Sequence, residues 1–129
     1  MKLNHDCVRD LMLFIEDNLD MGFYMDISKI AIPSYENQEL LYTALKLQEA
    51  GYLTTDISRF LDGKTNVRVL EITWEGHKFL DTIRDNKVWS QTKSVLSKVS
   101  SASITFASSV ASQVLTNLIT QSLSGQSFT

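Results

Sequence analysis

Residues 51–80 read "GYLTTDISRFLDGKTNVRVLEITWEGHKFL", and this stretch decides the fold. Two β-rich runs, residues 52–57 and 66–72, flank Asp62-Gly63, a dipeptide that favours the tight turn of a hairpin. Thr73 then supplies a side-chain cap for a helix that follows without a linker. The stretch therefore predicts a β-hairpin that runs directly into a helix.

Helices are expected on both sides of this hairpin. The first is capped by Asn4, and its apolar residues recur at steps of three and four. They are Val8, Leu11, Met12, Ile15 and Leu19. Ser34 is expected to open a second helix, which Gly51 ends. Between these helices, residues 23–32 fit either a short strand or a helical turn, and Pro33 closes the segment.

The resulting order is helix, short extended segment, helix, hairpin, helix. This order predicts an α+β fold, with a winged-helix-like domain over residues 1–86 in which the hairpin is the wing. Residues 87–129 are expected to form a C-terminal helical extension with a frayed end at "SGQSFT".

Charge changes sharply near this boundary. All fifteen acidic residues, and all but three of the twelve basic ones, lie before Asn86. From Val99 onward the sequence is Ser/Thr-rich and carries no charged side chain. Cys7 is the only cysteine, so no internal disulfide can form, and the first ten residues lack an apolar secretion signal. These features favour a cytoplasmic location.

Three segments carry a family resemblance: "MKLNHDCVRDLMLFIEDN", "ELLYTALKLQEAGYL" and "ITWEGHKFLDTIRDNKVW". Together they resemble a family of small bacterial and phage proteins catalogued as a domain of unknown function, similar to YjcQ-like winged-helix proteins. The resemblance covers roughly residues 1–98. It implies a winged-helix fold and a phage or prophage setting, but no activity. The short "MDISKIAIP" departs from the full helix that normally precedes a recognition helix.

Winged helices often bind duplex DNA through a recognition helix and the wing. The residues in suitable positions here are Gln38, Tyr42, Thr43 and Lys46 on the second helix, with Arg59, Lys64 and Arg68 on the wing. Three carboxylates on the same helix, Glu36, Glu39 and Glu49, would repel a polyanion. DNA binding is therefore the alternative interpretation.

The sequence favours neither catalysis nor a bound cofactor. His5, Asp6 and Cys7 are consecutive, and neighbours on a helix cannot all face one metal ion. We expect Asp6 to stabilise the helix start and Cys7 to pack as a small apolar residue. No phosphate-binding loop, nucleophile elbow or zinc-protease motif occurs. We therefore predict that the protein is not an enzyme, has no cofactor and has no metal site.

Two tryptophans bracket the third helix. We expect Trp74 to close the core beneath the wing, since aromatic residues supply much buried area. Trp89 is expected to fix the extension to the domain, and exposure at a partner interface is the alternative.

The extension carries an apolar helical stripe without charge. Its residues are Ile104, Phe106, Ala107, Val110, Ala111, Val114, Leu115 and Leu118. An apolar stripe of this kind is expected to be covered. It could fold back on its own domain, pair with a second copy or another protein, or contact a membrane. Its many Ser, Thr, Gln and Asn residues disfavour membrane insertion.

These patterns lead to one functional hypothesis and two alternatives. The hypothesis is a non-enzymatic, phage- or prophage-associated interaction protein that oligomerises or binds a protein partner through its C-terminal helix. The first alternative is a DNA-binding transcriptional regulator that uses the wing and second helix. The second alternative is a small protein that contacts membranes through its tail.

Overall fold

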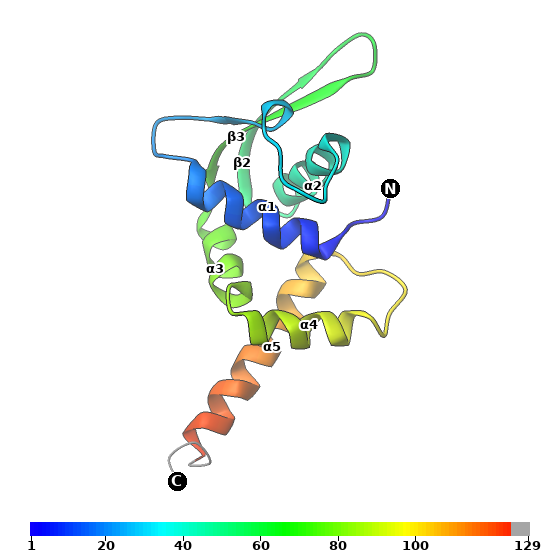
Figure 1. Ribbon diagram of the computed structural model, residues 1–129. Coiled ribbons are helices and arrows are strands. Elements are labelled where there is room, and N and C mark those ends of the chain that lie inside the picture. Colours follow the sequence, from blue (N-terminus) through cyan, green and yellow to red (C-terminus); the bar gives the residue numbers. More distant parts are fainter. Residues whose placement is uncertain (125–129) are drawn as a thin grey trace.

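The computed structural model describes residues 1–124, and the fold class is α+β as expected (Figure 1). Within these residues, five α-helices accompany a three-stranded antiparallel sheet. The elements are α1 (His5–Asn18), β1 (Met25–Asp26), η1 (Ile27–Lys29, a 3-10 turn), α2 (Asn37–Glu49), β2 (Leu53–Arg59), β3 (Thr65–Ile72), α3 (Trp74–Ile83), α4 (Asn86–Leu96) and α5 (Ile104–Leu123). The expected order of helix, short strand, helix, hairpin and helix is confirmed, with a helical C-terminal part. The expected fraying of the last residues concerns mainly residues 125–129, which lie outside the described part.

α1 begins and is buried as its sequence predicts. The Asn4 side chain accepts hydrogen bonds from the backbone N–H groups of Asp6 and Cys7, at 3.0 and 3.3 Å. Such a cap satisfies N–H groups that have no partner inside the helix. The inward face of α1 then supplies the centre of the core, through Cys7, Val8, Leu11, Met12 and Ile15.

The segment before α2 combines both conformations that the sequence allowed. Met25–Asp26 forms a short strand, and Ile27–Lys29 a single 3-10 turn. The prediction that Ser34 opens α2 is wrong. Ser34 has a positive φ of 80°, which no residue within a right-handed helix adopts, and α2 begins three residues later at Asn37.

The end of α2 is fixed by a Schellman motif. Gly51 has a φ of +83°, a conformation that glycine adopts without steric cost. The N–H of Tyr52 donates to the carbonyl of Leu47 and the N–H of Gly51 to that of Gln48, both at 2.9 Å. The chain thereby turns from α2 into β2, and the predicted stop at Gly51 is confirmed.

β3 is the central strand of the sheet, whose order is β1-β3-β2. A β-bulge interrupts its pairing with β2. Thr54 pairs with Glu71 and Thr55 with Val69, so Leu70 of β3 has no partner in β2. Before this bulge the strand alternates, with Val67 and Val69 buried. The hairpin closes at Asp62-Gly63, where the N–H of Gly63 donates to the carbonyl of Phe60 at 3.0 Å.

α3 follows β3 with Thr73 as its cap, accepting from the N–H of Gly76 at 3.0 Å. This cap turns Trp74 outward, and its side chain is 77% exposed. The prediction that Trp74 closes the core is therefore wrong. Phe79, five residues further along the helix, packs in the core in its place. Its ring is stacked on that of Tyr52, with 4.9 Å between the ring centroids.

The C-terminal part consists of two helices that share the core of the rest. α4 packs on α3, and α5 contacts both α3 and α4. Trp89, Ile104 and Ala111 belong to the same buried cluster as the inward face of α1. In Figure 1, the first half of α5 lies against this body, and its second half extends away from it toward the C-terminus.

Candidate interaction surfaces

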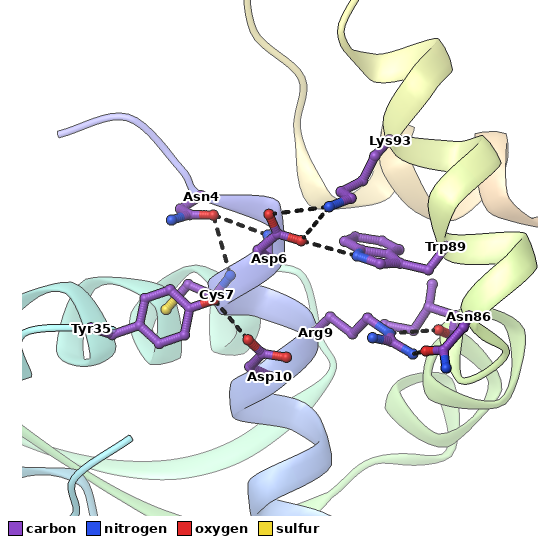
Figure 2. A network of polar contacts seen from close by, with 10 residues as sticks. Asn4, Asp6, Cys7, Arg9, Asp10, Tyr35, Asn86, Trp89 and Lys93 are labelled. Carbon is purple, nitrogen blue, oxygen red and sulfur yellow. Dashed lines mark hydrogen bonds and ion pairs between the residues drawn. The ribbon is translucent and has the colours of Figure 1, made fainter. Parts of the chain in front are cut away.

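Asp6 joins the start of α1 to α4 (Figure 2). Its carboxylate accepts from the indole Nε1–H of Trp89 at 3.1 Å and pairs with the Lys93 ammonium at 3.1 Å. Burial alone would raise the pKa of Asp6, but the contacts with Trp89 and Lys93 outweigh it and hold that pKa below its ordinary value. Trp89 is 5% exposed, so its predicted role of fixing the C-terminal part to the domain is confirmed.

Arg9 makes the second junction, one turn further along α1 (Figure 2). Its guanidinium donates to the carbonyls of Ile83 and Arg84 at 2.9 and 2.7 Å, and to Asn86 Oδ1 at 2.8 Å. It also lies over the Trp89 ring, 5.8 Å from the centroid. The carbonyls at the end of α3, which have no partner within that helix, are thus satisfied by α1.

The three consecutive residues His5, Asp6 and Cys7 face three different neighbours. His5 Nε2 lies 3.1 Å from the carbonyl of Ala102, and burial lowers the pKa of this imidazole. Cys7 is fully buried, and its Sγ lies 3.3 Å from the Thr43 hydroxyl. Among residues 1–124, no group of three metal-ligating side chains lies close enough to hold an ion.

The apolar stripe of α5 is divided between two surroundings. Four of its predicted interface residues, Ile104, Ala107, Ala111 and Val114, are buried against the protein's own helices. They are therefore unavailable to a partner while α5 is docked, which corrects the sequence-based assignment of these four. Phe106 is exposed, and Val110, Leu115 and Leu118 are partly exposed.

The second half of α5 borders an open groove with the start of α4. The groove has a volume of about 630 Å³, and its apolar lining comes from Val88, Leu115, Leu118, Ile119 and Leu123. Asp85 and Lys87 line it from the start of α4. Ile119 is 50% exposed and Leu123 73% exposed. An exposed apolar surface on a helix that carries no charge is a candidate protein-binding surface. The four of these residues that belong to α5, Leu115, Leu118, Ile119 and Leu123, are called the α5 surface below.

The predicted DNA-contacting residues are only partly free to contact a ligand. Thr43 is fully buried and its hydroxyl donates to the Glu39 carbonyl at 2.8 Å, so its assignment to base contact is wrong. Lys46 pairs with Glu49 at 3.0 Å, and Arg68 lies 3.8 Å from Asp56. The Tyr42 hydroxyl donates to the carbonyl of Met1.

A second groove lies between α2 and the hairpin tip and contains three of the predicted DNA-contacting residues, Gln38, Tyr42 and Lys64. It has a volume of about 700 Å³. Leu41 and Leu45 line it from α2, and Phe60, which is 56% exposed, from the hairpin. This groove is called the α2–hairpin groove below.

Sequence reasoning missed several of the apolar residues that line these two grooves, among them Leu41, Leu45, Phe60 and Ile119. The spacing of Leu40, Leu41, Ala44 and Leu45 places all four close to one apolar face of the helix. Their exposure depends on the angle at which α2 packs, which periodicity does not determine. Leu123 was likewise omitted, because the stripe was traced only as far as Leu118.

Within the described residues, no helix is long and apolar enough to cross a membrane. α5 is long enough in residues, but serine, threonine, glutamine and asparagine recur along it.

Comparison with known proteins identifies relatives by sequence. The family described as "Hypothetical protein (DUF2513)" matches residues 2–103. An uncharacterized protein of Haemophilus influenzae is 27% identical over 124 residues, which cover 95% of this chain and 99% of the relative. No solved structure matches. The family match ends just before α5, whereas the similarity to the H. influenzae protein extends over nearly the whole chain.

Proposed function

We propose that this chain, which belongs to the DUF2513 family of hypothetical proteins, is a non-enzymatic interaction protein that self-associates through the α5 surface. The observation that supports this most is the exposure of Ile119 and Leu123 on a helix that extends from the body. When a partner covers such exposed apolar side chains, the free energy falls by about 25 cal/mol per Å² of apolar area buried.

A second copy can cover the α5 surface without bringing the two acidic bodies together. The chain has a net charge of −3, and its acidic residues all precede Asn86, so two bodies repel each other. The second half of α5 carries no charge and lies away from the body, so two copies could pair there in a two-fold arrangement with the bodies apart.

The small size of the α5 surface limits the expected affinity of self-association. These four residues, on about two turns of helix, offer less than the roughly 1,200 Å² that stable interfaces bury. We therefore expect a dissociation constant in the range of about 1–100 μM.

Sedimentation of the full chain at several concentrations tests this proposal. We expect the apparent mass to rise toward twice the 14.6 kDa of one chain at about 100 μM. An Ile119→Ser/Leu123→Ser double variant should remain monomeric, since it removes apolar area without disturbing the buried face of α5. Leu61→Ser is the matched control, because Leu61 is fully exposed at the hairpin tip, away from α5. A full chain that stays monomeric throughout this range would contradict the proposal.

Binding of duplex DNA is the second candidate, favoured by the exposure of Arg59 and Lys64 at the hairpin tip. Neither side chain forms an ion pair within residues 1–124. A DNA-binding regulator should lose affinity in a Lys64→Glu variant and as salt rises. Fluorescence anisotropy with a labelled duplex separates this candidate from self-association, which neither change should weaken.

The winged-helix resemblance and the phage or prophage setting belong to this proposal as well. The position of the β2–β3 hairpin between α2 and α3 supports the resemblance to winged-helix proteins. The setting rests on the resemblance alone. It predicts that genes for close relatives lie beside genes for phage structural or replication proteins, which a survey of gene neighbourhoods would check.

A further inference from the structure

The α2–hairpin groove combines apolar side chains with polar groups that come from both of its sides. Leu41, Leu45 and Phe60 supply apolar surface. Gln38 stands on the α2 wall and Lys64 on the hairpin wall. Binding sites commonly have this composition: apolar area provides affinity, and a few polar groups set the orientation of the ligand.

Both polar groups are available to a ligand. Gln38 is exposed, and its amide makes no hydrogen bond within the described part of the chain. The backbone N–H of Lys64 donates to Asp62 Oδ1 at 3.0 Å. The Lys64 ammonium has no ionic partner among residues 1–124. Asn37 and Asn66, which also line the groove, already donate to the Ile27 carbonyl and to Asp26 at 2.8 and 2.9 Å.

The charge of the groove differs from that of the chain. The protein carries more acidic than basic residues, yet the lining includes Lys64 and no carboxylate. A ligand with an apolar body and one negative charge would be complementary to this lining.

We propose that the α2–hairpin groove binds an apolar segment of a partner protein that carries an acidic side chain opposite Lys64. The apolar residues of the segment cover Leu41, Leu45 and Phe60, its carboxylate accepts from the Lys64 ammonium, and a backbone group pairs with the Gln38 amide. This proposal goes beyond self-association and does not require the α5 surface.

Other occupants match the groove less well. A phosphate backbone would find one cation and would leave the three apolar side chains against charged oxygens. The second half of α5 from another copy is apolar but uncharged, so it would offer no carboxylate to Lys64. A lipid surface contacts protruding groups more readily than the floor of a groove.

Selection from a displayed library of random twelve-residue peptides, with the immobilised full chain as target, tests the proposal. We expect the selected peptides to be enriched both in Leu, Phe or Trp and in Asp or Glu. Synthetic labelled versions should bind Lys64→Glu and Leu45→Ser variants at least about tenfold more weakly than the original protein. Gln38→Ala should weaken binding by a smaller factor.

Matched controls separate the groove from general effects. Lys98→Glu makes the same charge change at an exposed position at the end of α4, and should leave peptide affinity within about twofold. The Ile119→Ser/Leu123→Ser variant should also bind normally, so failure of this proposal and failure of self-association remain distinguishable. Circular dichroism confirms that each variant is folded.

Three results would overturn the inference. The first is the absence of enrichment over the unselected library. The second is selected peptides that bind Lys64→Glu and Leu45→Ser as tightly as the original protein. The third is tight binding of a labelled DNA duplex or of phosphatidylglycerol vesicles that requires Lys64 and that the selected peptides do not displace.

Discussion

Gly76 lies where α3 packs tightly against the backbone just before β2. A Cβ atom at this position would lie 2.2 Å from the Tyr52 carbonyl oxygen and 2.8 Å from a methyl carbon of Ile72. Backbone on one side and a packed side chain on the other leave little room for adjustment. The absence of a side chain at residue 76 therefore determines how α3 sits on the sheet.

A Gly76→Ala variant should consequently be less stable, by about 2–3 kcal/mol. Helix propensity alone would give the opposite sign, because alanine favours a helix interior by about 1 kcal/mol over glycine. Urea unfolding followed by circular dichroism measures the difference. Lys78→Ala, at an exposed position of the same helix, should change the free energy of unfolding by less than about 0.5 kcal/mol. Equal or greater stability of Gly76→Ala would show that the close contact is absent.

Asp6 provides a pH-dependent contribution to stability at the junction of α1 and α4. Its folded-state pKa is lowered, so the unfolded chain binds a proton more readily. The stabilisation is therefore complete above the unfolded pKa of about 3.9, and is lost as pH falls through the lower folded-state pKa.

We expect Asp6→Asn to lower the free energy of unfolding at pH 7 by about 1 kcal/mol, a modest value because the side chain is half exposed. The difference between variant and original protein should shrink as pH falls below about 4. Urea unfolding at pH 7, 5 and 3 measures this trend, with Asp17→Asn on the exposed side of α1 as the control. A difference that stays constant from pH 7 to pH 3 would exclude the ion pair as its cause.

The two tryptophans show what local sequence predicts at the residue scale. Trp89 lies in the first half of α4 and faces α1. Its packing role was predictable because it stands close to the predicted boundary between the domain and the C-terminal part. Trp74 is the first residue of α3, and its direction depends on how Thr73 joins β3 to the helix. Composition favoured burial for both, but the junction geometry exposes one of them.

At the scale of whole elements, the signals that were read correctly are local ones. The Asp62-Gly63 turn, the Asn4 cap and the Gly51 stop each depend on residues a few positions apart, which the sequence displays directly. The start of α2 was misplaced because Ser34 adopts a positive φ, which serine rarely does. The division of the α5 stripe was also hidden, since it depends on α3 and α4, which approach one side of that helix only.

α5 should contribute to stability through its first half and to association through its second. A chain ended at Ser97 lacks Ile104, Ala107, Ala111 and Val114, and leaves their neighbours in the core exposed. We expect it to lose roughly 4 kcal/mol of stability or more. A chain ended at Asn117 retains all four residues and should stay within about 1 kcal/mol of the full chain, yet remain monomeric. Thermal unfolding and sedimentation of the two chains measure these outcomes. Full stability of the shorter chain would contradict the docking of α5.

At the scale of the whole molecule, charge and apolar surface are separated. The acidic residues lie on the part that contains the sheet and the first three helices, while the second half of α5 is neutral and exposed. The location of the candidate site on the C-terminal helix was predictable from the sequence, because the loss of charge after Lys98 is visible without a structure. Its actual residues did not, since the inner half of the stripe is used in folding.

This separation makes salt dependence the measurement that best distinguishes the two candidate functions. If Arg59, Lys64 and Arg68 each neutralised one phosphate, raising salt from about 50 to about 200 mM would weaken DNA binding roughly fortyfold. Self-association through the uncharged side chains of the α5 surface has no attractive ion pair to screen, and the bodies of two copies repel each other. We therefore expect the dimer dissociation constant, measured by sedimentation over this range, to stay constant or to fall by up to about twofold. A self-association that weakens steeply with salt would instead require oppositely charged surfaces to meet, and would place the interface on the charged body and not on α5.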